Sequence, residues 1–506
     1  MGSLKALIND FEYEIICGST DREYTDFVTD NRKLSKGCVF VCIKGAKFDG
    51  HTSVKQAIDA GAAAVVIEQN PKEILCLKDC FPLEANCDTT IIRVSRTRAA
   101  MALMACAIND YPSKKLTTIG ITGTKGKTTT TYLIKSILEK AGRKVGLIGT
   151  IETIIGSEHI PASNTTPEST VLQGYLKRMV DAGIDTVVME VSSQGLMLDR
   201  TLGIDFSIGI FTNLEADHIG PNEHTSFEQY AACKSLLFRQ CRLGIVNGDD
   251  KHLEMILKDH TCLVKSYGID KGHGADTGKC DFTAHDIEFV SEGGKLGMRF
   301  KVEGVSSLDA TINMPGMFSV YNGLCAVAVC KSLGISDEVI KEVLPKGSVR
   351  GRIEPVKVSD DFTLLIDYAH NAMALESLLV TLKEYKTGRL VCLFGCGGNR
   401  SRDRRFEMGE VSGKLADFTV ITSDNPRDED PMDIIADIET GINKTDGKYI
   451  KIPDRKEAIK YCIENGQKGD IIVLAGKGHE DYQEIKGVKY PMDERVLIKE
   501  ILDNLN

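Results

Sequence analysis

Hydrophobic and polar positions along the chain follow a pattern that predicts an α/β protein. Between about residues 113 and 345, apolar runs of strand length are separated by segments with helical spacing. The runs are Leu116–Ile121, Val145–Ile148, Thr186–Val191 and Ser207–Thr212. This alternation favours a mostly parallel sheet with helices on both faces. Within the same stretch, Thr283–Asn313 alternates as antiparallel strands do, and Met314–Leu333 then returns to helical spacing.

The pattern divides the chain into three blocks, which we expect to be domains: 1–112, 113–345 and 346–506. The first block combines a helix around Val54–Ala60 with an apolar strand at Ala62–Glu68. The third block is a second α/β unit with four apolar strands, at Thr363–Ile366, Arg389–Phe394, Phe418–Thr422 and Asp470–Leu474. Polar residues follow each of these strands, at the edge where open α/β sheets bind ligands.

Composition narrows the class of protein. A chain of 506 residues has room for two to four domains, each with its own core. The net charge of −10 argues against a protein that binds nucleic acid through a basic surface. Sixteen cysteines without a C-x-x-C pair indicate reduced thiols, and we interpret Cys76, Cys80 and Cys87 as structural. Reduced thiols favour a cytoplasmic protein, and with no apolar run of membrane-span length we expect no membrane insertion. We also expect a monomer.

The most informative motif is a glycine-rich turn between a predicted strand and a helix. Its residues are Gly123, Thr124, Lys125, Gly126, Lys127, Thr128 and Thr129. Glycines let main-chain N–H groups converge on an anion, and the helix N-terminus adds partial positive charge. Lys127 can reach the terminal phosphates of a nucleotide, and the Thr128 hydroxyl can hold Mg²⁺. Ile121 stands where the usual P-loop has its first glycine, so we predict a nucleoside triphosphate site of a shortened type.

An acidic residue at the end of another predicted strand is a candidate metal ligand. Glu190 closes the apolar strand that begins at Thr186 and precedes Ser192. In a P-loop-type sheet, a carboxylate at this edge can hold the Mg²⁺ that bridges the ATP phosphates. A glutamate that ends a strand often has no function. The prediction that Glu190 is a metal ligand therefore depends on its position after the phosphate loop in the same α/β unit.

Lys234 is predicted to point inward. The segment Phe227–Phe238 has helical spacing, and one stripe holds Lys234 together with Phe227, Tyr230, Ala231, Leu237, Phe238 and Cys241. The lysine could extend its stem to solvent. Alternatively, an enclosed amine can lose its proton and become nucleophilic, and it can then add CO₂ to form an anionic carbamate that binds Mg²⁺.

These motifs resemble the Mur ligase family over nearly the whole chain. A further match is the run from Asn213 to His218, in which the family has Asn-Leu, two variable residues and Asp-His. The resemblance implies three domains, with a central P-loop-type, mostly parallel sheet and a Rossmann-like C-terminal domain. It also implies an ATP-dependent ligase that forms an amide bond on UDP-N-acetylmuramoyl-L-alanyl-D-glutamate, through an acyl phosphate. Such a reaction belongs to peptidoglycan synthesis, and thus to cell-wall growth, cell shape and division.

The resemblance also implies roles for individual residues. The catalytic set would be Lys127, Glu190, His218 and Lys234, with Lys234 carbamylated. The Mg²⁺ ligands would be Thr128, Glu190, His218 and the carbamate on Lys234. Besides the loop 123–129, ATP would contact Asn322, Arg352 and Asp367.

For the UDP-muramoyl dipeptide, the resemblance implies two groups of residues. The uridine side would be formed by Asn31, Ala46, Lys47 and Phe48, and the muramoyl-peptide side by Asn164, Thr165, Thr166, Ser192 and Arg200. Two positions depart from the family, which often has His in place of Gln194 and Ser in place of Asn31. Both side chains still form hydrogen bonds, so the expected substrate class is unchanged.

The third block would bind the incoming amino acid. The residues implied are Arg400, Asp424, Asn425, Pro426, Arg427, Gly476 and Glu480. In the family, Asp-Asn-Pro-Arg accompanies meso-diaminopimelate, whose distal carboxylate suits the planar fork of arginine. L-lysine or lanthionine remain alternatives. So do a folylpolyglutamate- or cyanophycin-type ligase of the same fold and a nucleotide-binding homologue without turnover.

Overall fold

The computed structural model describes residues 2–45, 48–74, 88–216, 219–220, 223–269, 280–292, 295–305 and 307–505. The chain forms two compact units. One contains residues 1–127, 142–246 and 250–265, and the other contains residues 128–141, 247–249 and 266–506. Among the described residues, no helix is long and apolar enough to cross a membrane.

The N-terminal part of the first unit is built on a five-stranded sheet with the order β2-β7-β6-β5-β4. Its strands are β2 (Glu14–Cys17), β4 (Phe27–Val28), β5 (Val39–Val41), β6 (Ala64–Ile67) and β7 (Thr90–Arg93). Strand β2 is antiparallel to β7, and the other pairs are parallel. Successive residues of a strand face opposite sides. Accordingly, Phe40 packs with α2 (Val54–Asp59), whereas Val39 and Val41 pack with α1 (Leu4–Leu7) and α4 (Thr97–Ile108).

The remaining elements of this part are short. They are β1 (Gly2–Ser3), α1 (Leu4–Leu7), β3 (Glu23–Tyr24), η1 (Asn31–Lys33), η2 (Gly50–Ser53), η3 (Pro71–Glu73) and η4 (Pro112–Lys115), beside the longer α4 (Thr97–Ile108). The predicted helix around Val54–Ala60 and strand at Ala62–Glu68 are confirmed as α2 and β6.

The central sheet of the first unit has neighbouring strands in the order β11-β10-β9-β12-β8-β13-β14. The parallel strands are β8 (Thr117–Thr122), β9 (Val145–Ile148), β12 (Thr186–Glu190), β13 (Phe206–Phe211) and β14 (Cys241–Asn247). At one edge, β10 (Glu152–Ile155) and β11 (Glu158–Pro161) form an antiparallel hairpin. The carboxyl ends of β8, β12 and β13 therefore lie side by side, and they place the glycine-rich turn beside Glu190.

Helices α6 (Ser169–Asp181), α7 (Ser193–Met197) and α8 (Phe227–Ser235) contribute to one core cluster with this sheet. Leu172, Leu176 and Met179 of α6 pack there with alternate β12 residues such as Val187. Helix α8 ends at Ser235 and continues as the 3-10 helix η5 (Leu236–Arg239), followed by α9 (Leu253–Ile256) after β14. The predicted helical stripe therefore stops before Cys241, which is the first residue of β14.

The second unit begins with an antiparallel region. Strand β15 (Leu263–Ile269) pairs in parallel with β16 (Phe282–Glu292), and β17 (Lys295–Gly304) and β18 (Leu308–Ile312) continue antiparallel. The helices of this region are α5 (Lys127–Lys140), α10 (Met317–Ser332), α11 (Asp337–Val343) and η6 (Leu344–Lys346). The predicted change to antiparallel strands and the return to a helix are both confirmed.

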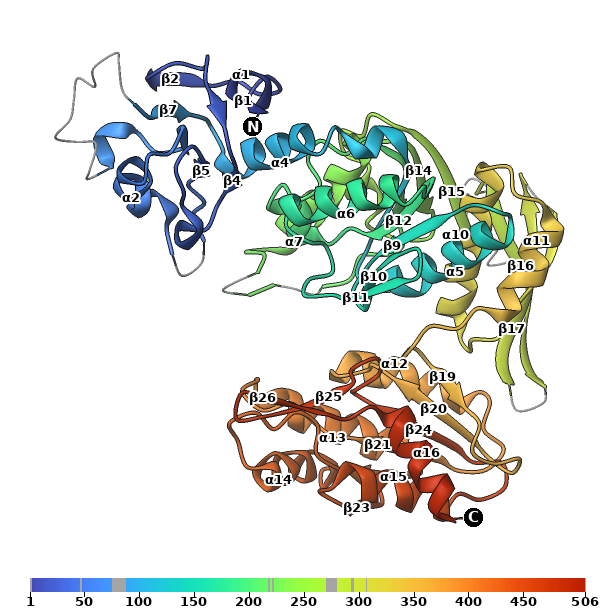
Figure 1. Cartoon of the computed structure of the whole chain (residues 1–506). Helices are drawn as coiled ribbons and strands as arrows, with labels where there is room; N and C mark the ends of the chain where they lie inside the picture. The colour runs from blue at the N-terminus through green and yellow to red at the C-terminus, as the bar shows by residue number, and fades with distance from the viewer. Residues whose placement is uncertain are drawn as a thin grey trace. The chain divides into compact units, whose positions relative to one another are not determined.

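The C-terminal sheet has the order β19-β20-β24-β21-β22-β23. Strand β19 (Glu354–Val356) is antiparallel to β20, and the parallel strands are β20 (Thr363–Asp367), β21 (Leu390–Phe394), β22 (Phe418–Ile421), β23 (Tyr449–Lys451) and β24 (Ile471–Ala475). Helices α15 (Arg455–Glu464) and α16 (Glu494–Leu505) bury their apolar faces against it. Helices α12 (Ala372–Lys383), α13 (Asp403–Leu415) and α14 (Pro431–Ile442) pack together and on β21 and β22 (Figure 1). A hairpin of β25 (Tyr482–Ile485) and β26 (Val488–Pro491) follows β24.

The described cysteines are free thiols, and all except Cys280 are buried. Burial raises the pKa of five of them to about 12: Cys106, Cys325, Cys392, Cys396 and Cys462. Such thiols stay protonated and pack as small apolar groups. This agrees with the prediction of reduced thiols, whereas Cys76, Cys80 and Cys87 lie outside the described residues.

Candidate active site

The glycine-rich turn between β8 and α5 is held by the segment that follows β13. Thr124 N donates to Asn213 O (2.9 Å), and Lys125 N donates to Asn213 Oδ1 (2.8 Å). Gly123 adopts φ +147°, and a Cβ there would lie 1.9 Å from Thr212 Oγ1. Only glycine fits at this position. The close packing of the turn on Thr212 therefore requires Gly123.

Two ammonium groups meet beside this turn. Lys127 Nζ donates to Gly123 O (2.8 Å) and Thr124 O (3.0 Å), and Lys234 Nζ donates to Gly123 O (2.9 Å). Lys234 is 1% exposed and lies 4.5 Å from the centre of the Tyr230 ring. The inward direction predicted for Lys234 is thus confirmed. Two cations on one carbonyl oxygen repel each other, so an anion bound beside them would be stabilised.

Glu190 is the buried carboxylate at the end of β12. Its Oε1 accepts from Thr150 N (2.9 Å), and its Oε2 accepts from Thr150 Oγ1 (3.0 Å). Carboxylate oxygen is a ligand that Mg²⁺ prefers. Among the residues that the structure describes, no three His, Cys, Asp or Glu side chains form a metal-binding group. A Mg²⁺ on Glu190 would therefore need further oxygen ligands, such as phosphate oxygens or a carbamate. His218 lies outside the described residues.

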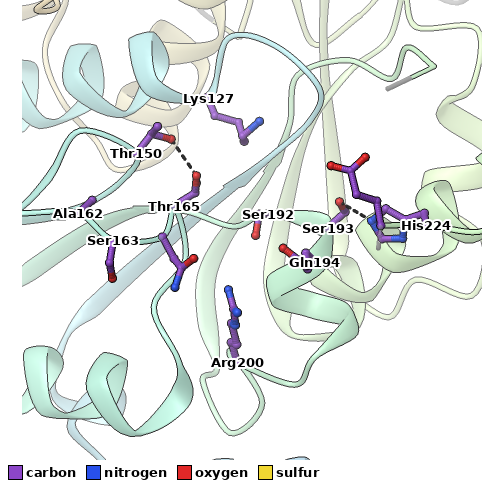
Figure 2. A pocket seen from close by; sticks show the side chains of 12 residues that line it. Lys127, Thr150, Ala162, Ser163, Thr165, Ser192, Ser193, Gln194, Arg200 and His224 are labelled. Carbon is purple, nitrogen blue, oxygen red and sulfur yellow. Dashed lines mark hydrogen bonds between the residues drawn. The ribbon is translucent and has the colours of Figure 1, made fainter. Parts of the chain in front are cut away.

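A pocket of about 330 Å³ opens next to the turn. Its lining residues are Lys127, Thr150, Ala162, Ser163, Asn164, Thr165, Ser192, Ser193, Gln194, Arg200, Glu223 and His224. In the view of Figure 2, Lys127 lies above and Arg200 below, with Ser192 and Thr165 between them. The structure thus brings the predicted phosphate-binding lysine to the same cavity as four of the residues predicted for the muramoyl-peptide side.

Thr166, which is also predicted for the muramoyl-peptide side, is joined by hydrogen bonds to the pocket residue Ser192. Thr166 is fully buried and accepts from Ser192 N (2.9 Å), while its own hydroxyl donates to Glu190 O (3.0 Å). Arg200 Nη1 donates to Thr166 O (2.9 Å), and Nη2 donates to Glu168 Oε1 (2.6 Å). Arg200 Nε is buried and makes no hydrogen bond within the described part of the chain. A buried donor of this kind is consistent with a ligand that supplies the missing acceptor.

The residues predicted for the uridine side are only partly described, because Ala46 and Lys47 lie outside the described residues. Asn31 begins η1 and donates from Nδ2 to Gln56 Oε1 (3.2 Å), and Phe48 is 53% exposed. Close by in sequence, His51 is buried and contacts Asp49 Oδ1 through Nδ1 (2.7 Å). None of these side chains lines the 330 Å³ pocket.

In the second unit, Asn322, Arg352 and Asp367 are the residues predicted to contact ATP. Asn322 is buried and accepts from Thr130 Oγ1 (3.3 Å). Asp367 accepts from Ile353 N and Ala369 N, both at 2.8 Å, and burial raises its pKa. Arg352 lies 5.1 Å from the Tyr368 ring, and its buried Nε makes no hydrogen bond to the described residues.

Two histidines flank Tyr368. The rings of His370 and His479 each lie 4.7 Å from the Tyr368 ring. Burial, together with the positive charge of Arg352, lowers the pKa of His479 to about 4. Burial also lowers the pKa of His370. Both imidazoles are therefore neutral near pH 7, and Arg352 carries the positive charge of this group.

The residues predicted to bind the amino acid meet at the carboxyl edge of the C-terminal sheet. Asn425 Nδ2 donates to Glu480 Oε2 (3.0 Å), and a Cβ on Gly476 would lie 3.0 Å from Asp424 Oδ2. Both predicted arginines flank Gly397: a Cβ there would lie 2.9 Å from Arg427 Nη1 and 3.8 Å from Arg400 Cγ. Pro426 joins Asn425 to Arg427 and is buried.

Comparison with known proteins identifies the family. The sequence pattern described as "Mur ligase middle domain" matches residues 121–330, "Mur ligase, glutamate ligase domain" matches 351–478, and "Mur ligase family, catalytic domain" matches 24–108. The UDP-N-acetylmuramoyl-L-alanyl-D-glutamate–2,6-diaminopimelate ligase of Caldanaerobacter subterraneus subsp. tengcongensis is 43% identical over 498 residues, which cover 98% of each chain. The chain belongs to the Mur ligase family.

Two further Mur ligases agree with this result over the full length. The UDP-N-acetylmuramoyl-L-alanyl-D-glutamate–2,6-diaminopimelate ligase 1 of Clostridium acetobutylicum is 43% identical over 505 residues, or 99% of each chain. A solved structure of a ligase with the same substrate name is 28% identical, with a TM-score of 0.70 over 99% of each chain. The predicted Mur ligase fold, with a central P-loop-type sheet and a Rossmann-like C-terminal domain, is thus confirmed.

Sequence reasoning missed residues in each of the two units of this Mur ligase. Thr150 fixes Glu190, and Ser193 lies 2.8 Å from His224 Nε2 on the pocket wall. Thr150 and Ser193 belong to no predicted motif. They lie at the pocket because Thr150 follows β9, Ser193 follows β12, and these strands run parallel to β8. Lys477, in the second unit, stood within the Gly-Lys-Gly-His-Glu run, but its complete burial could not be read from the sequence.

Proposed function

We propose that this chain is an ATP-dependent ligase that joins meso-diaminopimelate to UDP-N-acetylmuramoyl-L-alanyl-D-glutamate, a cytoplasmic step of peptidoglycan synthesis. The observation that carries the proposal is the 330 Å³ pocket, in which Lys127 of the phosphate loop shares a cavity with Asn164, Thr165, Ser192 and Arg200. A phosphate donor and a carboxylate acceptor would meet at such a place. The names of the full-length relatives support the same substrate.

The reaction would proceed in two steps. The D-glutamate carboxylate attacks the γ-phosphorus of ATP, which gives an acyl phosphate and ADP. The amine of the amino acid then adds to the acyl carbon, loses a proton, and expels phosphate as the amide forms. Catalysis in such transfers comes mainly from positioning and from stabilisation of phosphoryl charge.

In this scheme, Lys127 and the main-chain N–H groups of residues 123–129 hold the phosphates. Bound Mg²⁺ would neutralise phosphoryl oxygens, and its proposed protein ligands are Thr128, Glu190, His218 and a carbamate on Lys234. Glu190 fits because its buried carboxylate is fixed by Thr150. Lys234 fits because its enclosed Nζ lies 2.9 Å from the loop carbonyl of Gly123, where a carbamate would lie beside bound phosphate.

Residues of the second unit would complete the enzyme. Asn322, Arg352 and Asp367 are proposed to contact the nucleotide, and the buried Arg352 Nε is available for an anion. Arg427 and Arg400 are proposed to bind the distal carboxylate of meso-diaminopimelate, and Glu480 its ammonium. The residues for uridine would be Asn31, Ala46, Lys47 and Phe48. We propose that the enzyme acts as a monomer and that the three blocks 1–112, 113–345 and 346–506 are its domains.

A phosphate-release assay with purified protein tests the proposal. We expect phosphate only when ATP, the UDP-muramoyl dipeptide and an amino acid are all present, and the fastest release with meso-diaminopimelate among a panel that includes L-lysine and lanthionine. Release with a folate or another acyl acceptor in place of the dipeptide would indicate a different ligase of the same fold. Nucleotide binding without release would indicate a homologue that has lost turnover.

A further inference from the structure

The amino-acid site contains a carboxylate that the proposed function leaves without a role. Glu484 lies on β25, and its Oε2 accepts from Arg427 Nε (3.1 Å). Arg427 Nη1 donates to Gly398 O (2.7 Å). Within the described part of the chain, Nη2 makes no hydrogen bond. Two of the three nitrogen atoms of the guanidinium are therefore fixed by the protein, and Nη2 remains for a ligand.

The main chain holds the same pair together. Arg427 N donates to Glu484 O (3.0 Å), and Lys486 N donates to Arg427 O (2.8 Å). Arg427 adopts φ +53°, a left-handed conformation that is uncommon for a side chain of this size. Strain of this kind persists where the surroundings over-determine the backbone. The hairpin of β25 and β26 thus fixes the main-chain position and conformation of Arg427.

A second ion pair lies next to the first. Lys477 is fully buried, and its Nζ donates to Glu480 Oε2 (2.7 Å) and Asn425 Oδ1 (3.0 Å). Asn425 Oδ1 also accepts from Glu484 N (2.8 Å), while its Nδ2 donates to Glu480. The amide of Asn425 therefore connects both ion pairs, and its orientation follows from these partners.

We propose that Glu484 is a positioning residue that sets the specificity of the amino-acid site, an inference that rests on the proposed function. It orients Arg427 through Nε so that Nη2 faces the substrate carboxylate, and it balances the charge of Arg427 when the site is empty. Two neutral ion pairs match a zwitterionic group, in which an ammonium and a carboxylate share one carbon. A side chain that ends in an ammonium alone would add an unbalanced positive charge and leave Nη2 without a partner.

The first test compares two changes at one position. Glu484→Ala removes both the hydrogen bond and the charge, and we expect the KM for meso-diaminopimelate to rise about 10-fold. Glu484→Gln keeps an acceptor for Nε but not the charge, and we expect a rise of about threefold, because charge-assisted hydrogen bonds are about twice as strong as neutral ones. The KM values for ATP and for the UDP-muramoyl dipeptide should change less than about twofold in both variants.

The matched control is Glu410→Gln, which removes a carboxylate from α13 that pairs with Lys414 on the surface. It should leave all three KM values within about twofold of the unchanged protein. Glu484 and Arg427 are themselves about a quarter exposed, at 27% and 22%, so both Glu484 variants should fold, which thermal unfolding checks.

The second test is a double-mutant cycle on selectivity, the ratio of kcat/KM for L-lysine to that for meso-diaminopimelate. Arg427→Met leaves the Glu484 carboxylate uncovered beside the substrate ammonium, so this ratio should rise. Adding Glu484→Gln removes that carboxylate, and the ratio should fall back by about 10-fold.

Three results would overturn the inference. They are an unchanged KM for meso-diaminopimelate in Glu484→Ala, an equal rise for all three substrates, and additive effects on selectivity in the cycle. If the unchanged protein forms no amide with any amino acid, the proposed function itself fails. If it uses meso-diaminopimelate and Glu484→Ala behaves as the control does, only the role of Glu484 is wrong.

Discussion

The phosphate-loop region and the amino-acid region handle charge in different ways. At the loop, Lys127 and Lys234 donate to main-chain carbonyl oxygens. In the C-terminal sheet, Lys477 and Arg427 donate to the carboxylates Glu480 and Glu484. The first arrangement brings two ammonium groups to one main-chain oxygen, which suits a strongly anionic ligand. The second is balanced before a ligand arrives and suits a zwitterion, whose binding requires exact placement of both signs rather than net attraction.

The largest expected effect concerns the balanced site. The protein should use L-lysine about 10⁴-fold less efficiently than meso-diaminopimelate, because a site built to pair a polar group rejects an analogue that lacks it. Arg427→Ala should lose most of its efficiency with meso-diaminopimelate and change the affinity for ATP little. Steady-state kinetics with both amino acids measure this. Comparable efficiencies in the unchanged protein would refute the predicted amino acid but not the ligase.

At the positively charged site, Lys127→Ala should lower kcat by about 10³-fold, because Lys127 stabilises charge that grows in the transition state. The affinity for the UDP-muramoyl dipeptide should be nearly unchanged, since the proposed uridine contacts lie in the first block. Single-turnover kinetics and direct binding separate the two quantities. Turnover equal to that of the unchanged protein would refute the assignment of the phosphate loop.

The variant Lys234→Ala tests whether the amine of Lys234 is converted to an anionic carbamate. We expect a loss of about 10²-fold. A short carboxylic acid added to the assay should restore part of the activity by supplying an oxygen ligand. Electron density at the tip of Lys234 in a crystal would reveal the carbamate directly. A bare ammonium there, together with full activity of Lys234→Ala, would contradict the proposal.

The last expected effect is on stability and not on activity. His479 has a folded-state pKa of about 4, below the unfolded value near 6.5. The folded protein therefore binds fewer protons, and stability falls as the pH drops from about 6.5 to 4. The penalty is about 3 kcal/mol at most, and it is absent above pH 6.5. Urea unfolding across this range should show a smaller decline for His479→Gln than for the unchanged protein. If the free energy of unfolding fell equally in both proteins, His479 would not be the source of the pH dependence.

The sequence predicted those parts of the fold that depend on local pattern. The strands β8, β9, β12 and β13 and the turn that follows β8 were located within one or two residues, because apolar runs and glycines mark them. The hairpin of β10 and β11 was missed, since each strand has only four residues and β11 is mostly exposed. The inward direction of Lys234 followed from helical spacing, whereas its contact with Gly123 depends on how α8 packs.

The candidate site was less accessible to prediction where contacts join distant segments. Arg427 and Glu480 were predicted through motifs, but Glu484, which holds Arg427 from β25, belongs to none of them. Thr150 was missed for the same reason, because it reaches Glu190 across 40 residues of chain. A motif records the residues that touch a ligand in many relatives, while the residues that support them vary with local packing.

The buried thiols have a practical consequence. Cys38 and Cys42 flank β5 in the core of the N-terminal part, Cys241 begins β14, and Cys392 and Cys462 are buried in the C-terminal part. An alkylating reagent can modify such a group only when the surrounding structure opens, because the reagent cannot reach an enclosed sulfur. The rate at which each cysteine is alkylated, followed by mass spectrometry, would thus measure how fast each sheet opens. No cysteine would have to be introduced for this experiment.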